Sequence, residues 1–99
     1  MHRNLLTVVA EMVAQPGKED ELRQALLGLV EPTRQEEGFV QYDLHQATGE
    51  PGRFLFYENW TSAAALEHHL QSPHLVAFLD VSGGLLAEPP RILTYARIA

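Results

Sequence analysis

Three of the five histidines lie within seven residues, in the segment HHLQSPH, as His68, His69 and His74. An imidazole ring can bind a metal ion, or it can accept and donate a proton near neutral pH. Ligands on one helix share a face at spacings of three or four residues, whereas His68 and His69 are adjacent, and a Ser-Pro break separates both from His74. Glu67 is the only carboxylate beside the cluster. The spacing therefore does not predict a metal site.

The break itself indicates proton-transfer chemistry for two of the three rings. Ser72 predicts a helix N-cap and Pro73 a first helical position, so two helices meet here at an angle and can turn His69 and His74 toward one side. His74 falls in the first turn of the second helix, where the helix dipole favours the neutral ring that a general base requires. Capping or packing is the alternative role for His74, and we expect His68 on the helix surface.

A carboxylate and an indole share one face of the segment RFLFYENW, because side chains alternate along a strand and Glu58 and Trp60 are two residues apart. A buried carboxylate is costly unless it is paired. Glu58 is therefore expected either to hydrogen-bond a helix histidine, which would set the tautomer of that ring, or to pair with an arginine for structure. Trp60 is either a core residue or the aromatic wall of a site.

The elements that carry these residues follow from the periodicity of the chain. Apolar residues alternate in the strands and recur every three or four positions in the helices. The helix that starts near residue 19 should kink or end at Pro32, and at the latest stop at Gly38. We predict strands at 5–13, 39–46, 53–60 and 91–98, and helices from 19, at 63–70 and from 73 to the Gly83-Gly84 pair.

This order predicts a single α+β domain over residues 1–99, a ferredoxin-like sandwich whose four-stranded antiparallel sheet has its helices on one face. The second face would carry large side chains whichever way the strand at 53–60 is turned. An exposed apolar patch of several hundred Å² is unusual on a monomer. We therefore predict a homodimer in which two sheets pack face to face as a dimeric α/β barrel.

Composition narrows the classes of function. The net charge is −6 and the seven Lys and Arg residues are scattered, which opposes nucleic-acid binding. There is no cysteine, so thiolate chemistry and disulfides are excluded, and the chain suits a reducing cytoplasm. The apolar run near the N-terminus is too short to cross a bilayer. We expect a soluble cytoplasmic protein with no membrane or nucleic-acid partner.

The segments PGKED, EEGFVQYDLH, FLFYENW and LEHHLQSPHLVAF together resemble the antibiotic biosynthesis monooxygenase family, in particular its small quinol monooxygenases. The resemblance covers nearly the whole chain, and its most specific part runs from Glu58 to His74. It implies a dimeric ferredoxin-like barrel that oxidises a small phenol, quinol or aromatic polyketide with O₂ to a quinone. It also implies that no metal, flavin or haem takes part.

The resemblance implies roles for individual residues. His69 and His74 become the acid and base, Glu58 the group that orients a histidine or a substrate hydroxyl, and Trp60 the aromatic wall. Additional substrate contacts are expected from Tyr57, Asn59 and Phe78. In an alternative arrangement, Tyr57 and Asn59 face the dimer partner instead.

The sequence is also compatible with other activities. The chain could be a non-catalytic dimeric barrel with a binding or stress-response role, in which aromatic side chains fill the cavity. A related branch acts as an isomerase of a small phosphorylated signal molecule, which would require arginines in the pocket. Haem degradation is not expected, because Ala10, His69 and Leu79 stand where the haem-degrading relatives carry their asparagine, tryptophan and histidine.

Overall fold

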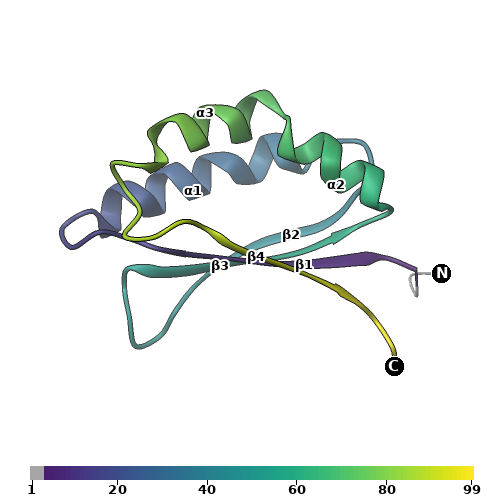
Figure 1. Cartoon of the computed structure of the whole chain (residues 1–99), viewed down its shortest axis with the longest axis horizontal. Helices are drawn as coiled ribbons and strands as arrows, with labels where there is room; N and C mark the ends of the chain where they lie inside the picture. The colour runs from purple at the N-terminus through teal and green to yellow at the C-terminus, as the bar shows by residue number, and fades with distance from the viewer. Residues whose placement is uncertain (1–3) are drawn as a thin grey trace.

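The computed structural model of the protein describes residues 4–99, and its elements follow the predicted order (Figure 1). The strands predicted at 39–46 and 53–60 and the helix predicted at 63–70 have the predicted bounds, whereas the first strand begins one residue later and the last strand ends two residues earlier than predicted. The elements are β1 (Leu6–Val13), α1 (Glu19–Thr33), β2 (Phe39–Gln46), β3 (Arg53–Trp60), α2 (Ala63–Leu70), α3 (Pro73–Ser82) and β4 (Arg91–Ala96).

The four strands form one antiparallel sheet in the order β2-β3-β1-β4, and the three helices all cover the same face of it (Figure 1). This is the predicted α+β ferredoxin-like fold. Within residues 4–99, no helix has both the length and the apolar character needed to cross a bilayer.

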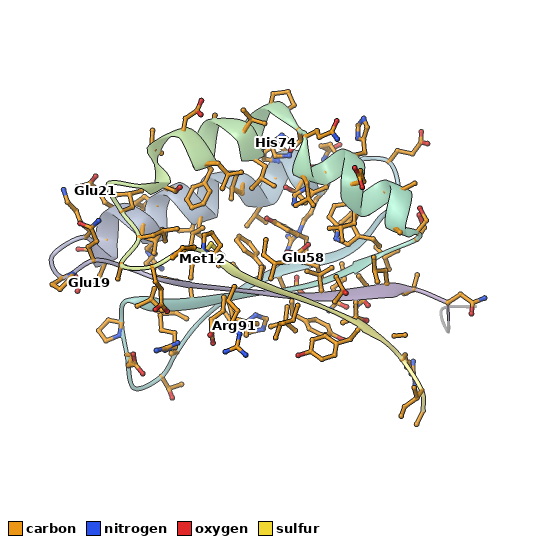
Figure 2. All side chains as sticks on the ribbon, viewed as in Figure 1. Met12, Glu19, Glu21, Glu58, His74 and Arg91 are labelled. Atoms are coloured by element: carbon orange, nitrogen blue, oxygen red, sulfur yellow. The ribbon has the colours of Figure 1, made fainter. Side chains whose placement is uncertain are left out.

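Alternation along the strands decides which side chains enter the core. Val8, Ala10 and Met12 of β1 point toward the helices and are buried, as are the residues of β3 that pair beside them. In Figure 2, Met12 and Glu58 lie on the helix side of the sheet and Arg91 lies on the other. The helix side is closed by α1, whose buried residues recur at helical spacing: Leu22, Leu26 and Leu29.

The connection from α1 to β2 is a series of tight turns. Pro32 lies inside the last turn of α1, where it has no N–H to donate to the carbonyl of Gly28, and the helix ends one residue later at Thr33. Gly38 then has a φ of +84°, and a Cβ at this position would lie 2.4 Å from the Cβ of Ala65 in α2. Only glycine allows both this backbone conformation and the close approach of α2. The turn fixes Glu36, two residues earlier, beneath the helix pair.

Candidate functional site

Glu36, His69 and His74 meet at one point. The Oε2 atom of Glu36 lies 2.8 Å from His69 Nδ1 and 2.6 Å from His74 Nε2. The side chains of Glu36, His69 and His74 are 8%, 3% and 19% exposed, so the cluster is buried and His74 alone has appreciable contact with solvent.

The Ser-Pro break brings the two rings together. His69 is in the last turn of α2 and His74 is the second residue of α3. Between them the chain turns at Ser72, whose N–H donates to the carbonyl of His69 and whose Oγ accepts from the N–H of Leu75. The predicted cap is therefore confirmed, and the two helices meet at an angle that lets both rings reach one carboxylate oxygen. His68 is exposed, as expected.

His69 packs among aromatic side chains. Its ring centroid is 4.7 Å from that of Trp60 and 5.4 Å from that of Tyr42. Burial lowers the pKa of His69 below its usual 6.5, although the hydrogen bond and the charge of Glu36 act in the opposite direction. The ring is therefore held mainly neutral. Since Nδ1 faces Glu36, Nε2 is the nitrogen that remains for another group.

Glu58 has a different partner from those expected. Its Oε1 accepts a hydrogen bond of 2.9 Å from Trp60 Nε1, and within residues 4–99 it bonds no histidine or arginine. The two residues are neighbours on one strand face, so the indole reaches the carboxylate without any help from a helix. Burial raises the pKa of Glu58 to about 7, the Trp60 bond opposes this, and the charge of Glu36 adds to it.

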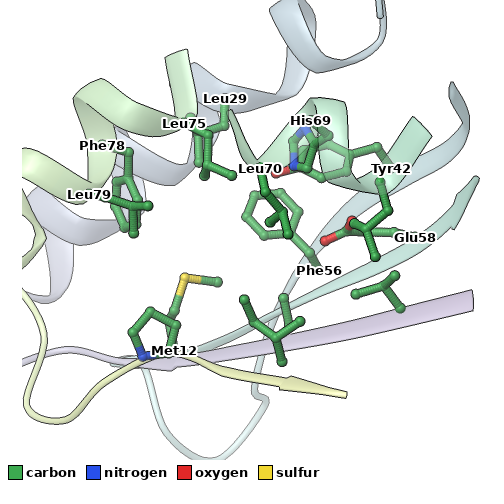
Figure 3. A pocket seen from close by; sticks show the side chains of 15 residues that line it. Met12, Leu29, Tyr42, Phe56, Glu58, His69, Leu70, Leu75, Phe78 and Leu79 are labelled. Carbon is green, nitrogen blue, oxygen red and sulfur yellow. The ribbon is translucent and has the colours of Figure 1, made fainter. Parts of the chain in front are cut away.

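An apolar cavity of about 70 Å³ lies between the sheet and the helices (Figure 3). Fifteen residues line it, and most are aliphatic or aromatic. Among the lining residues are three that the sequence had indicated for the site: Glu58, His69 and Phe78. The hydroxyl-bearing Tyr42 also lines it, and its pKa is raised well above the usual range by burial and by the nearby charge of Glu58.

Two of the other candidates lie behind the cavity wall. Trp60 is fully buried and is not a lining residue, although it contacts both Glu58 and His69. His74 likewise reaches Glu36 but does not line the cavity. Neither side chain therefore offers a wall to a molecule in the cavity.

The expectation that Tyr57 and Asn59 line the same site is not met. They alternate with Glu58 and Trp60 along β3, so they lie on the sheet face that carries no helix. The amide of Asn59 accepts from Thr7 Oγ1 at 2.6 Å and donates to Gln41 Oε1 at 2.9 Å. Both residues therefore lie outside the cavity.

Glu36 is the site residue that sequence reasoning missed. The chain offers two adjacent carboxylates before Gly38, and the side chain of Glu36 is 8% exposed, while Glu37 is exposed. The signal that the sequence offered for this residue was the pair of adjacent carboxylates between a helix end and a glycine turn. Glu67 is the carboxylate beside the histidines in the sequence, but in the folded chain Glu36 brings an oxygen within 4.8 Å of both ring nitrogens.

The arrangement can do two kinds of chemistry. A carboxylate can only accept hydrogen bonds, so it can hold both imidazoles with their N–H groups toward it and orient them for proton transfer. Two imidazole nitrogens and one carboxylate oxygen are also a common ligand set for divalent transition metals.

Comparison with known proteins agrees with the resemblance drawn from the sequence. A family model described as "Antibiotic biosynthesis monooxygenase" matches residues 5–81. "Probable quinol monooxygenase YgiN" of Escherichia coli K12 is 36% identical over 102 residues, covering 90% of this chain and 96% of that protein. "Uncharacterized protein sll1783" of Synechocystis is 33% identical over 90 residues, covering 91% of this chain, which spans only 61% of that relative's length.

Solved structures show the same fold. PA3566 from Pseudomonas aeruginosa superimposes with a TM-score of 0.93 at 35% identity, covering 100% of this chain and 99% of that one. With the matched segment, the shared fold and the sequence relatives in agreement, the chain belongs to the antibiotic biosynthesis monooxygenase family.

Proposed function

We propose that the protein is a cofactor-independent monooxygenase that oxidises a small phenol or quinol with O₂ to a quinone. The observation that carries this proposal is the placement of His69, whose ring lines an apolar cavity while its Nδ1 lies 2.8 Å from the buried carboxylate of Glu36. The name of the Escherichia coli relative, a probable quinol monooxygenase, supports the same class of substrate.

His69 is the proposed general base. Glu36 accepts from the Nδ1–H group, which selects the tautomer whose Nε2 is an acceptor, and this nitrogen removes the phenolic proton. His74 is a positioning residue, because it donates to the same oxygen of Glu36 and so helps to hold the carboxylate in place. General-base catalysis of this kind contributes about 10²- to 10⁴-fold in rate.

The substrate itself supplies the electrons. After loss of its proton, the electron-rich anion gives one electron to O₂, and the resulting radical and superoxide combine to form a peroxide. Loss of water from the peroxide yields the quinone. One oxygen atom enters the product and the other leaves as water, while the substrate loses two hydrogens and four electrons. An apolar cavity protects the anion from bulk water during these steps.

The cavity favours a small substrate. A volume of about 70 Å³ is smaller than the roughly 150 Å³ of a cavity that holds benzene, so the site favours a single ring over a polycycle. Glu58 and Tyr42 are the other polar groups at its wall, and they are placed to hydrogen-bond a substrate oxygen. None of the fifteen lining residues is Arg or Lys, so the cavity offers no cation to a phosphorylated substrate of an isomerase.

The proposed enzyme is a homodimer that packs through the open face of the sheet. One cross-strand row on this face places Leu93, Val9 and Tyr57 side by side, and Leu93 and Tyr57 are 38% and 37% exposed. Glu11, paired with Arg91, lies in the next row toward one end of the strands. An apolar centre with a charged rim is the usual anatomy of a subunit interface.

O₂ consumption tests the proposal. Chelator-treated protein is given a panel of hydroquinones, naphthohydroquinones and anthrols, and the rate of autoxidation without protein is subtracted. We expect turnover by the wild type, a loss of at least about 100-fold in His69→Gln, and no change in His68→Gln, which alters the exposed neighbour. Absence of turnover on every substrate would favour the non-catalytic binding barrel, and full activity of His69→Gln would remove His69 as the base.

A further inference from the structure

The carboxylate of Glu36 is only half satisfied. Its Oε2 contacts two histidine nitrogens, but its Oε1 is buried and has no hydrogen-bond partner among residues 4–99. A buried carboxylate oxygen without a partner is costly, and such atoms call for an explanation. Hydrogen bonds with His69 and His74 account for the burial of Oε2, but they do not account for the burial of Oε1.

A bound cation could be ligated by all three residues of the cluster, Glu36, His69 and His74. Metal–ligand distances to histidine nitrogen and carboxylate oxygen are about 2.0–2.2 Å, so two ligands on one tetrahedral ion lie about 3.3 Å apart. The contacts of Glu36 Oε2 to the two nitrogens are 2.8 and 2.6 Å, and all three ligand atoms lie within 4.8 Å of one another. Small side-chain shifts would bring the three atoms to bonding distance, and Oε1 could become a further ligand.

We propose that Glu36, His69 and His74 bind one divalent transition-metal cation, with Zn²⁺ as the probe. Two imidazoles and one carboxylate are ligands that Zn²⁺ accepts, and three protein ligands leave a position for water. His74 is the most exposed of the three side chains, so the ion reaches the site from its side.

Binding of the ion would switch off the proposed base. A metal on Nδ1 of His69 places the ring hydrogen on Nε2, so the nitrogen available to the substrate donates a hydrogen bond and no longer accepts a proton. This consequence rests on the proposed function, whereas metal binding itself does not. The cation is therefore an inhibitor that competes with the protons shared by Glu36 and the two rings.

Calorimetry on the full chain tests the site directly. Chelator-treated protein is titrated with Zn²⁺, and with Co²⁺ while its visible absorption is recorded to identify nitrogen and oxygen ligands. We expect one ion per chain, bound at least about tenfold more weakly in His74→Ala and Glu36→Gln. The controls His68→Ala and Glu37→Gln alter exposed neighbours and should bind as the wild type does. Circular dichroism checks that each variant is folded.

The outcomes separate the two proposals. No binding of either ion, or equal binding by all variants, would overturn the site. Inhibition of O₂ consumption by Zn²⁺, reversed by chelator and weakened in His74→Ala, supports the switch, and an unchanged rate in the loaded protein overturns it. If the metal-free wild type consumes no O₂ with any phenol, the proposed function fails while the calorimetric result stands.

Discussion

The Nδ1 atom of His69 lies 2.8 Å from Oε2 of Glu36, although 33 positions separate the two residues in the chain. A carboxylate behind a histidine fixes the tautomer of the ring and stabilises the charged ring that forms after proton uptake. The contact joins the turn before β2 to the end of α2, so the proposed base depends on the packing of two distant segments.

Replacing Glu36 with Gln should reduce O₂ consumption. The amide keeps the shape of the side chain but loses the charge that supports a protonated His69, so part of the 10²- to 10⁴-fold contribution of the base is lost, and we expect a decrease of about 10- to 100-fold. Glu37→Gln is the matched control, since Glu37 is the exposed neighbour. Steady-state rates with the best quinol measure the effect, and equal rates for the two variants would contradict it.

The stability of the protein should depend on pH through Glu58. Its pKa rises from 4.5 to about 7 in the folded state, mainly because of burial. The contribution of the protonated carboxyl to stability is therefore fully present below pH 4.5, falls as pH rises, and is lost above about 7. This change corresponds to about 3 kcal/mol as an upper figure. Tyr42, Glu36 and His69 also face this region, and they are present in both the wild type and the variant.

Glu58→Gln therefore should be more stable than the wild type at pH 8 and similar to it at pH 4.5, because glutamine still accepts from Trp60 and does not ionise. Urea unfolding at the two pH values measures this difference. Glu67→Gln, at an exposed helix position, should show no such dependence. A constant difference between wild type and Glu58→Gln across this range would show that Glu58 is not buried as described.

Two glycines with the same backbone conformation should respond differently to alanine. Gly17 and Gly38 have φ values of +85° and +84°, so each substitution meets the cost of the left-handed region, about 1–2 kcal/mol. A Cβ at Gly17 meets no atom within 4 Å, whereas one at Gly38 would clash with Ala65. Gly38→Ala should lose a further 1–3 kcal/mol or so.

The displaced turn should also move Glu36, so Gly38→Ala should lose activity while Gly17→Ala keeps it. Thermal unfolding and O₂ consumption of the two variants give the comparison. Equal stability of the two variants would mean that α2 yields easily at Ala65 and that the turn does not set the position of Glu36.

The subunit interface can be tested by one charge on the open face of the sheet. Light scattering after size exclusion should give two chains per particle for the wild type and one for Leu93→Asp, because an aspartate at the apolar centre is desolvated without a partner. Val81→Asp, at an exposed position of α3, is the control and should remain dimeric. A wild type that elutes as a single chain at every concentration would exclude the interface.

Local patterns in the sequence were sufficient to predict the helices and strands and one side of the site. The period of two placed Glu58 and Trp60 on one strand face, and Ser72-Pro73 marked the junction that brings His69 and His74 together. The same alternation also implied that Tyr57 and Asn59 could not share that face. These features are determined by the sequence because they depend on backbone geometry over a few residues.

Which side chains contact one another in the site was decided by the tertiary structure alone. Glu36 and Glu37 are chemically identical neighbours, but the packed helices place the Glu36 side chain, which is 8% exposed, against His69 and His74 and leave Glu37 exposed. Glu58 accepts a hydrogen bond from Trp60 and not from a helix residue, because the histidines of α2 and α3 contact Glu36 instead. The contacts of Glu36 with His69 and His74 join positions 33 and 38 residues apart, and they are set by packing between elements, which no local pattern encodes.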